Sequence, residues 1–156
     1  MKPIIRDIKQ GTYGLEGVFQ FAPFEMDVRV SIDKDGNVQF AERCVALANS
    51  LSQKVLDHLC EASIRYCNDF LESVGEPTRD FETPREVLQI IRPSVLIIPE
   101  RPADADPVFH MELNCDWEDE HGMEWIVRDN KVLYVGPFNG HNPMGECSRN
   151  KSWNHA

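Results

Sequence analysis

The first part of the chain alternates between apolar and polar residues, and this period of two predicts β-strands with one buried face and one wet face. The clearest run lies between residues 24 and 32, where every second position is apolar: Phe24, Met26, Val28, Val30 and Ile32. The sequence DKDGN at 33–37 then predicts a turn, because Gly36 can adopt a positive φ. A calcium loop is the alternative for these acidic residues, but the remaining ligands of such a loop are missing from the sequence.

Apolar residues next recur at steps of three or four, which predicts one long helix, Ala41–Val74. The apolar stripe is wide, as expected for a helix that lies across a sheet. The pattern weakens at Asn49-Ser50, so we expect a kink or a break there. Gly75 and Pro77 follow the last apolar residue and mark the end of the helix.

A short second helix is predicted from Thr83, with Thr83 as its cap, Pro84 at its first position and Glu86 closing a capping box. Pro93 prevents this helix from continuing beyond about Ile91. Residues 94–98, a serine followed by four apolar residues, then predict a strand, and the lack of alternation predicts that both of its faces are covered.

Alternation returns in residues 107–138 and predicts a meander of three antiparallel strands. We expect its turns at Glu118–Gly122 and at Asp129-Asn130. In the first of these strands, Leu113 and Cys115 should face the core, while His110 and Glu112 should face the open side.

Together these elements predict an α+β fold. Its sheet is mostly antiparallel and combines the N-terminal strands with the C-terminal meander, and the long helix packs on one face. Residues 1–138 form a single domain in this interpretation. Residues 139–156 are rich in Asn, Gly, Ser and His and have no period, so we expect a loosely docked tail.

The charge of the chain narrows the classes of partner. Sixteen basic and 26 acidic residues give a formal net charge of −10. This charge disfavours nucleic acid and favours a basic partner. The five cysteines show no C-x-x-C spacing, and the chain has neither a signal peptide nor a long apolar run. We therefore expect a cytoplasmic protein that does not enter a membrane.

The candidate chemistry lies in the predicted acidic turn. Asp116, Glu118 and Glu120 are spaced by two, so an extended chain would place their carboxylates on one face, beside His121. The binding residues of this hypothesis are the five polar side chains of the turn: Asp116, Glu118, Asp119, Glu120 and His121.

Three interpretations of this turn stay open. In the plainest one, Trp117 packs over the hairpin end, Gly122 supplies a left-handed backbone position, and the carboxylates are simply solvated. In the second, Asp116, Glu120 and His121 bind a divalent metal ion, in a pattern that is neither an EF-hand nor H-E-x-x-H. In the third, the acidic side chains contact a partner protein.

The same residues resemble a known signature. The segment 117–122 is W-x-x-E-H-G, followed by alternating strand residues and Val135-Gly136. It is similar to the C-terminal hairpin of a family of small, uncharacterised bacterial proteins, a domain-of-unknown-function class. The resemblance covers residues 12–138 and includes Ile64-Arg65-Tyr66 of the predicted helix, although Cys67 stands where a second aromatic residue is usual.

The resemblance implies a fold of strands, a long helix and a β-meander, and it supplies no catalytic residues. Such domains are associated with toxin–immunity loci, which is an association and not a mechanism. We therefore expect a non-enzymatic acidic binding protein of the immunity type, whose partner is a basic toxin and which needs no cofactor. A metal-binding turn and a scaffold domain without any site are the alternatives.

Overall fold

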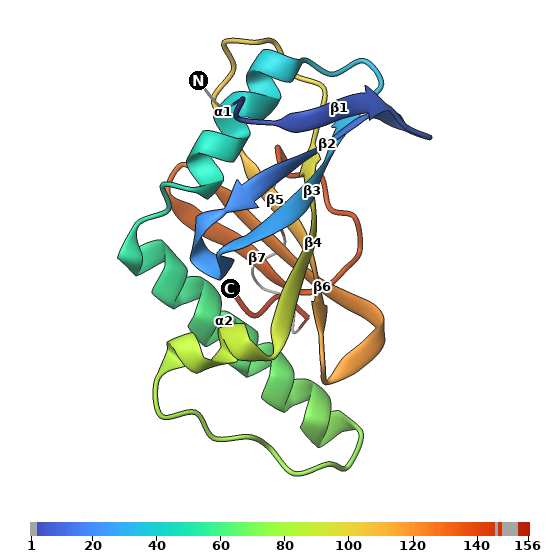
Figure 1. The fold of residues 1–156 in the computed structure, drawn as a ribbon. Helices are drawn as coiled ribbons and strands as arrows, with labels where there is room; N and C mark the ends of the chain where they lie inside the picture. Colours follow the sequence, from blue (N-terminus) through green and yellow to red (C-terminus); the bar gives the residue numbers. More distant parts are fainter. Residues whose placement is uncertain (1–2, 146, 148–152) are drawn as a thin grey trace.

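A computed structural model describes residues 3–145, 147 and 153–156. Its strands form one seven-stranded sheet in chain order, in which only β3 and β4 run parallel to each other (Figure 1). The fold is therefore α+β with a mostly antiparallel sheet, as the sequence predicted. The elements are β1 (Arg6–Gln10), β2 (Gly14–Phe21), η1 (Ala22–Phe24), β3 (Met26–Asp33), α1 (Val38–Ala48), α2 (Gln53–Ser73), η2 (Pro84–Gln89), β4 (Ile91–Ile98), β5 (Phe109–Cys115), β6 (Glu118–Arg128) and β7 (Lys131–Pro137).

The helices connect the two parallel strands and cover one face of the sheet (Figure 1). This face holds the main core, to which Phe19, Leu59, Leu96 and Trp125 contribute side chains without exposed surface. None of the described helices is long and apolar enough to cross a membrane.

The predicted long helix is in fact two helices, and the break falls where the apolar pattern weakens. The side chain of Asn49 accepts a hydrogen bond from the Ala22 N–H at 2.8 Å and donates one to the Gln20 carbonyl at 2.8 Å. Ser52 then caps α2 by accepting from the Val55 N–H. Asn49 thus anchors the end of α1 to the end of β2, and the chain turns before α2 begins.

The cysteines of these helices are small buried groups. Cys44, Cys60 and Cys67 are free thiols without exposed surface. Burial raises their pKa values to about 11 and that of Cys115 to about 12. These thiols therefore stay protonated near neutral pH and are poor nucleophiles.

The region around Pro93 differs from its prediction in two ways. The short helix is the 3-10 helix η2, and Thr83 makes no side-chain cap, while the Glu86 carboxylate accepts from the Glu82 N–H. The predicted capping box is therefore wrong. The prediction that the strand is covered on both faces is also wrong, because Val95 and Ile97 of β4 are only half-buried.

The second face of the sheet is open over β2–β4 and part of β5, and it is covered by the chain end over His110 of β5 and over β6 and β7. Tyr134 of β7 is fully buried there and packs against the rings of His141 and Trp153. The His155 N–H donates to the Val135 carbonyl at 2.8 Å, so the chain end also pairs with the edge of the sheet. Residues 146 and 148–152 of the predicted tail lie outside the described residues.

Candidate functional site

The acidic segment is not the turn that the sequence predicted. Cys115 pairs with Glu118, so the chain reverses at Asp116-Trp117 and Glu118 already belongs to β6. The next pair is Leu113 with Met123, which leaves extra residues in β6 as a bulge. The period of two gives no warning of such a bulge, and the predicted turn at Glu118–Gly122 is therefore misplaced.

Trp117 and Gly122 attach this hairpin to α2. Trp117 is 6% exposed and packs edge-on against the ring of Tyr66, with centroids 5.6 Å apart. The Tyr66 hydroxyl donates to the Gly122 carbonyl at 3.2 Å. Gly122 has a φ of +72°, and a Cβ there would lie 2.7 Å from the Leu113 carbonyl oxygen. The bulge therefore requires glycine at this position.

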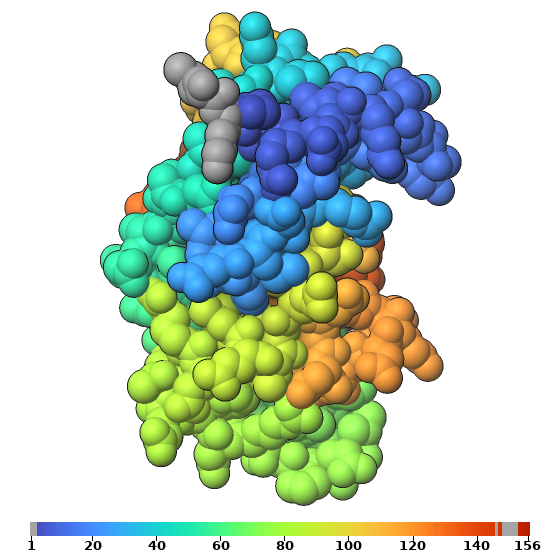
Figure 2. Space-filling model, viewed as in Figure 1, coloured from blue at the N-terminus to red at the C-terminus, as the bar shows by residue number. Residues whose placement is uncertain are grey.

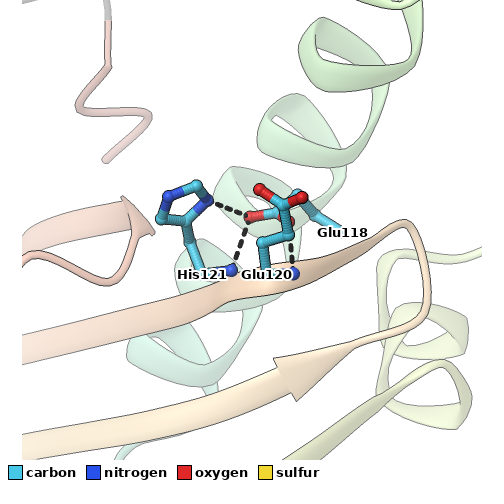
Figure 3. Close-up of side chains that lie close together, drawn as sticks. All are labelled: Glu118, Glu120 and His121. Atoms are coloured by element: carbon cyan, nitrogen blue, oxygen red, sulfur yellow. Dashed lines mark hydrogen bonds and ion pairs between the residues drawn. The ribbon is translucent and has the colours of Figure 1, made fainter.

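The five predicted binding residues do not form one continuous patch. Asp116 is engaged by Arg79, whose Nη1 lies 2.8 Å from a carboxylate oxygen. Glu118 is buried and its carboxylate accepts from the N–H groups of Glu120 and His121, at 2.6 and 3.0 Å, and faces His121 Nδ1 at 3.0 Å (Figure 3). Asp119, Glu120 and His121 are exposed.

The predicted metal ligands are also not brought together as a set. Asp116 is absent from the group, whereas Glu118, Glu120 and His121 each place one ligand atom within 4.8 Å of the others (Figure 3). The bulge causes this exchange, because it turns His121 back toward the carboxylate of Glu118. A second exposed group of this kind consists of Asp33, Asp35 and Glu100.

The exposed carboxylates of the hairpin continue onto a neighbouring segment. The ion pair between Arg79 and Asp116 holds the loop after α2 beside the hairpin. In Figure 2 the end of α2 and this loop form the bottom of the molecule, and the orange hairpin projects beside them. We call this surface the acidic end; its exposed carboxylates, none in an ion pair with a described residue, are Glu72, Glu76, Asp80, Glu82, Asp119 and Glu120.

A buried polar cluster on the second face was not anticipated. Glu124 has no exposed surface, and its carboxylate lies 2.5 Å from His110 Nε2 and 2.7 Å from His141 Nδ1. Burial alone would raise the pKa of Glu124, but the hydrogen bonds from His110, His141 and the Asn139 N–H outweigh it, so the pKa is lowered. His110 faces the second face as expected, yet it is buried because the segment around His141 covers it.

One feature of the sequence could have pointed to this cluster. Glu124 is the only charged residue within the apolar strand segment MEWIV, at 123–127. Its partner His141 lies 17 positions later, in a segment without periodicity, so no pattern in the sequence connects the two.

Comparison with known proteins identifies the family. Neither the search of curated proteins nor that of solved structures found a match. A family model matches residues 5–142. This range includes every strand of the sheet and the two histidines that contact Glu124, His110 and His141. The chain therefore belongs to the family described as "Domain of unknown function (DUF6985)".

Proposed function

We propose that this domain is a non-enzymatic binding protein that receives a basic protein partner on its acidic end. The partner would be a toxin of a bacterial cell, and the domain would act in the cytosol as an immunity-type inhibitor. Its carboxylates would cover basic residues of the toxin's active site. The observation that carries the proposal is the gathering of six exposed carboxylates, none of which forms an ion pair with a described residue, on two segments that the ion pair between Arg79 and Asp116 joins.

The distribution of positive charge supports the same surface. The chain from Val55 to Asn130 contains no lysine. Two arginines are close in sequence to the carboxylates of the acidic end, and both form ion pairs. Arg79 pairs with Asp116, and Arg85 pairs with Asp57. Arg92 also lies beside the hairpin, because it pairs with Asn114, so the negative charge there is only partly balanced, and it would speed the approach of a basic protein.

The test begins with capture of the partner from the cells that make the protein and its identification by mass spectrometry. The association rate constant is then measured at low and high salt. A variant with Asp119→Asn and Glu120→Gln should associate several-fold more slowly at low salt, and the difference should disappear at high salt.

Asp104→Asn with Asp106→Asn is the matched control, because both residues are exposed and the variant loses the same charge elsewhere on the surface. It should associate at nearly the wild-type rate. An acidic partner, or equal slowing by both variants, would contradict the proposal.

A divalent metal site is the second candidate, and the spacing of Glu118, Glu120 and His121 favours it. Oxygen ligands suit calcium or magnesium, and the imidazole suits zinc. A metal ion would have to displace the contact between His121 Nδ1 and Glu118, which now occupies one carboxylate oxygen.

Calorimetric titration of chelator-treated protein with calcium, magnesium and zinc tests this candidate. Heat of binding for one metal that is lost in Glu120→Gln and retained in Asp116→Asn would support the site as the structure arranges it. Flat traces for all three metals would remove it.

A further inference from the structure

The uncovered part of the second face contains a hollow of about 600 Å³. In Figure 1 this face lies opposite the helices, and the segment after β7 runs beside it. Gly140, His141 and Pro143 of that segment line the hollow beside β5, and Tyr13, which precedes β2, also lines it. The volume is within the range of small-molecule sites in proteins, roughly 300–1,000 Å³.

The floor of the hollow is apolar, and charged side chains stand on both sides of it: Arg29, Glu16 and Asp33 on the β2–β3 side and Glu112 on the β5 side. Val95 of β4 pairs with Arg29 on β3 and with Glu112 on β5, so the three side chains stand in one row on the same face. Ile97 continues the floor and pairs with Ser31. Two strand spacings separate the backbones of β3 and β5, roughly 10 Å.

The charged groups of this row are not satisfied by each other. Arg29 is exposed and makes no ion pair or hydrogen bond with a described residue, and the same holds for the half-buried carboxylate of Glu112. Glu16 and Asp33 also line the hollow without pairing with Arg29. A cation and carboxylates that share one hollow but remain apart can each bind a different end of one ligand.

The wall on the β5 side is held in place by buried hydrogen bonds. His110, which also lines the hollow, is fixed through Nε2 by the Glu124 carboxylate, and the same carboxylate fixes His141. Glu124 thus keeps the covering segment on the sheet and defines the edge of the hollow. Such preorganisation lowers the entropic cost of binding.

We propose that this hollow binds a small zwitterion with an apolar body, of the class of apolar dipeptides. Its carboxylate lies toward Arg29 and Ser31, its ammonium group lies toward Glu112, and its side chains rest on Val95 and Ile97. An extended dipeptide spans roughly 7 Å, which the long side chains of Arg29 and Glu112 can bracket across the 10 Å gap. This site is separate from the acidic end and does not depend on a protein partner.

Four probes with one carbon skeleton test the proposal: leucyl-leucine, its N-acetylated form, its C-terminal amide and the form blocked at both ends. Binding is followed by calorimetry and by the methyl resonances of Val95 and Ile97. Leucyl-leucine should bind most tightly, and blocking either end should weaken binding about tenfold, the loss expected for one charge-assisted contact. The doubly blocked form should bind most weakly.

Two variants assign the charges to their residues. Arg29→Gln should lower the affinity for leucyl-leucine and abolish the difference between the free acid and the amide. Glu112→Gln should abolish the difference between the free and acetylated amino group. The controls Arg92→Gln and Glu61→Gln, which change exposed residues outside the hollow, should leave both differences intact.

Several results would overturn the proposal. One such result is that no probe shifts the methyl resonances of Val95 and Ile97. Another is that a singly blocked form binds as tightly as leucyl-leucine, and a third is that the Arg29→Gln and Glu112→Gln variants bind the probes as the wild type does. Wild-type unfolding temperatures for Arg29→Gln and Glu112→Gln would show that these results do not arise from misfolding. Failure of this test would leave the acidic end unaffected, because that surface is measured with a protein partner and different variants.

Discussion

Glu124 shows how a single residue can hold two parts of this molecule together. Its buried carboxylate joins His110 of β5 to His141 of the covering segment. A buried charge is tolerated only when it is paired and hydrogen-bonded, and here donors reach both oxygens. Removal of the charge would leave two imidazole groups without their shared partner.

The stability of the protein should therefore depend on the protonation of Glu124. Since its pKa in the folded protein lies below the ordinary value of 4.5, its contribution is present above that pH and is lost as the pH falls through the folded pKa. Glu124→Gln should lower the free energy of unfolding by about 3 kcal/mol at neutral pH. The difference in the free energy of unfolding between Glu124→Gln and the wild type should become smaller at acid pH. Urea unfolding at a series of pH values would measure it.

Glu120→Gln is the matched control for this pH series, because Glu120 is an exposed glutamate of the same strand. It should follow the wild type at every pH. A constant gap between Glu124→Gln and the wild type from neutral to acid pH would mean that Glu124 is not the group that titrates.

Trp117 and Glu120 are neighbours in the hairpin but should contribute very differently to stability. Trp117→Ala removes a buried ring from Tyr66 and should cost about 3 kcal/mol. Glu120→Gln changes an exposed side chain and should cost less than about 0.5 kcal/mol. Chemical denaturation of both variants measures these values, and similar costs would show that the hairpin is held by charge and not by packing.

At the scale of elements, the bulge in β6 decides which side chains meet. It brings His121 to Glu118 and leaves Asp116 to Arg79. Gly122 makes this backbone path possible, because a Cβ would collide with the Leu113 carbonyl. The arrangement of the candidate metal ligands therefore depends on a residue that contributes no ligand.

Gly75 provides a matched control for Gly122. It has a φ of +76°, but a Cβ there would meet nothing within 4 Å. Gly75→Ala should cost about 1 kcal/mol from backbone strain alone, and Gly122→Ala about 3 kcal/mol because the collision adds to the strain. Equal losses of stability for the two variants in thermal unfolding would show that the bulge accommodates a Cβ at position 122 without additional free-energy cost.

The elements also show which features a sequence pattern can predict. Strands β3, β5, β6 and β7 follow from local alternation, although β6 is buried on both faces because the chain end covers its second face. The break before α2 was expected, but its cause, the bonds from Asn49 to the end of β2, joins residues 27 and 29 positions apart. The bulge at Gly122 and the burial of Glu124 depend on such distant contacts, so the pattern misplaced the turn and missed the cluster.

At the scale of the whole molecule, charge and shape are distributed unevenly. The net charge is −10, and the six exposed carboxylates of the acidic end gather on one part of the molecule. One face of the sheet is covered by helices, whereas the other leaves a hollow beside the chain end. A basic protein would be drawn to the acidic end over about 8–10 Å at moderate salt, the distance beyond which charges are screened.

The most direct test of the central claim maps where cations gather on the intact protein. Backbone amide shifts of isotope-labelled protein are recorded by NMR during titration with a hexalysine peptide at low and high salt. The account predicts that the largest shifts fall between Glu72 and Glu82 and at Asp119–His121, and that they vanish at high salt. Largest shifts at Asp104–Asp106, or shifts spread evenly over the surface, would contradict it.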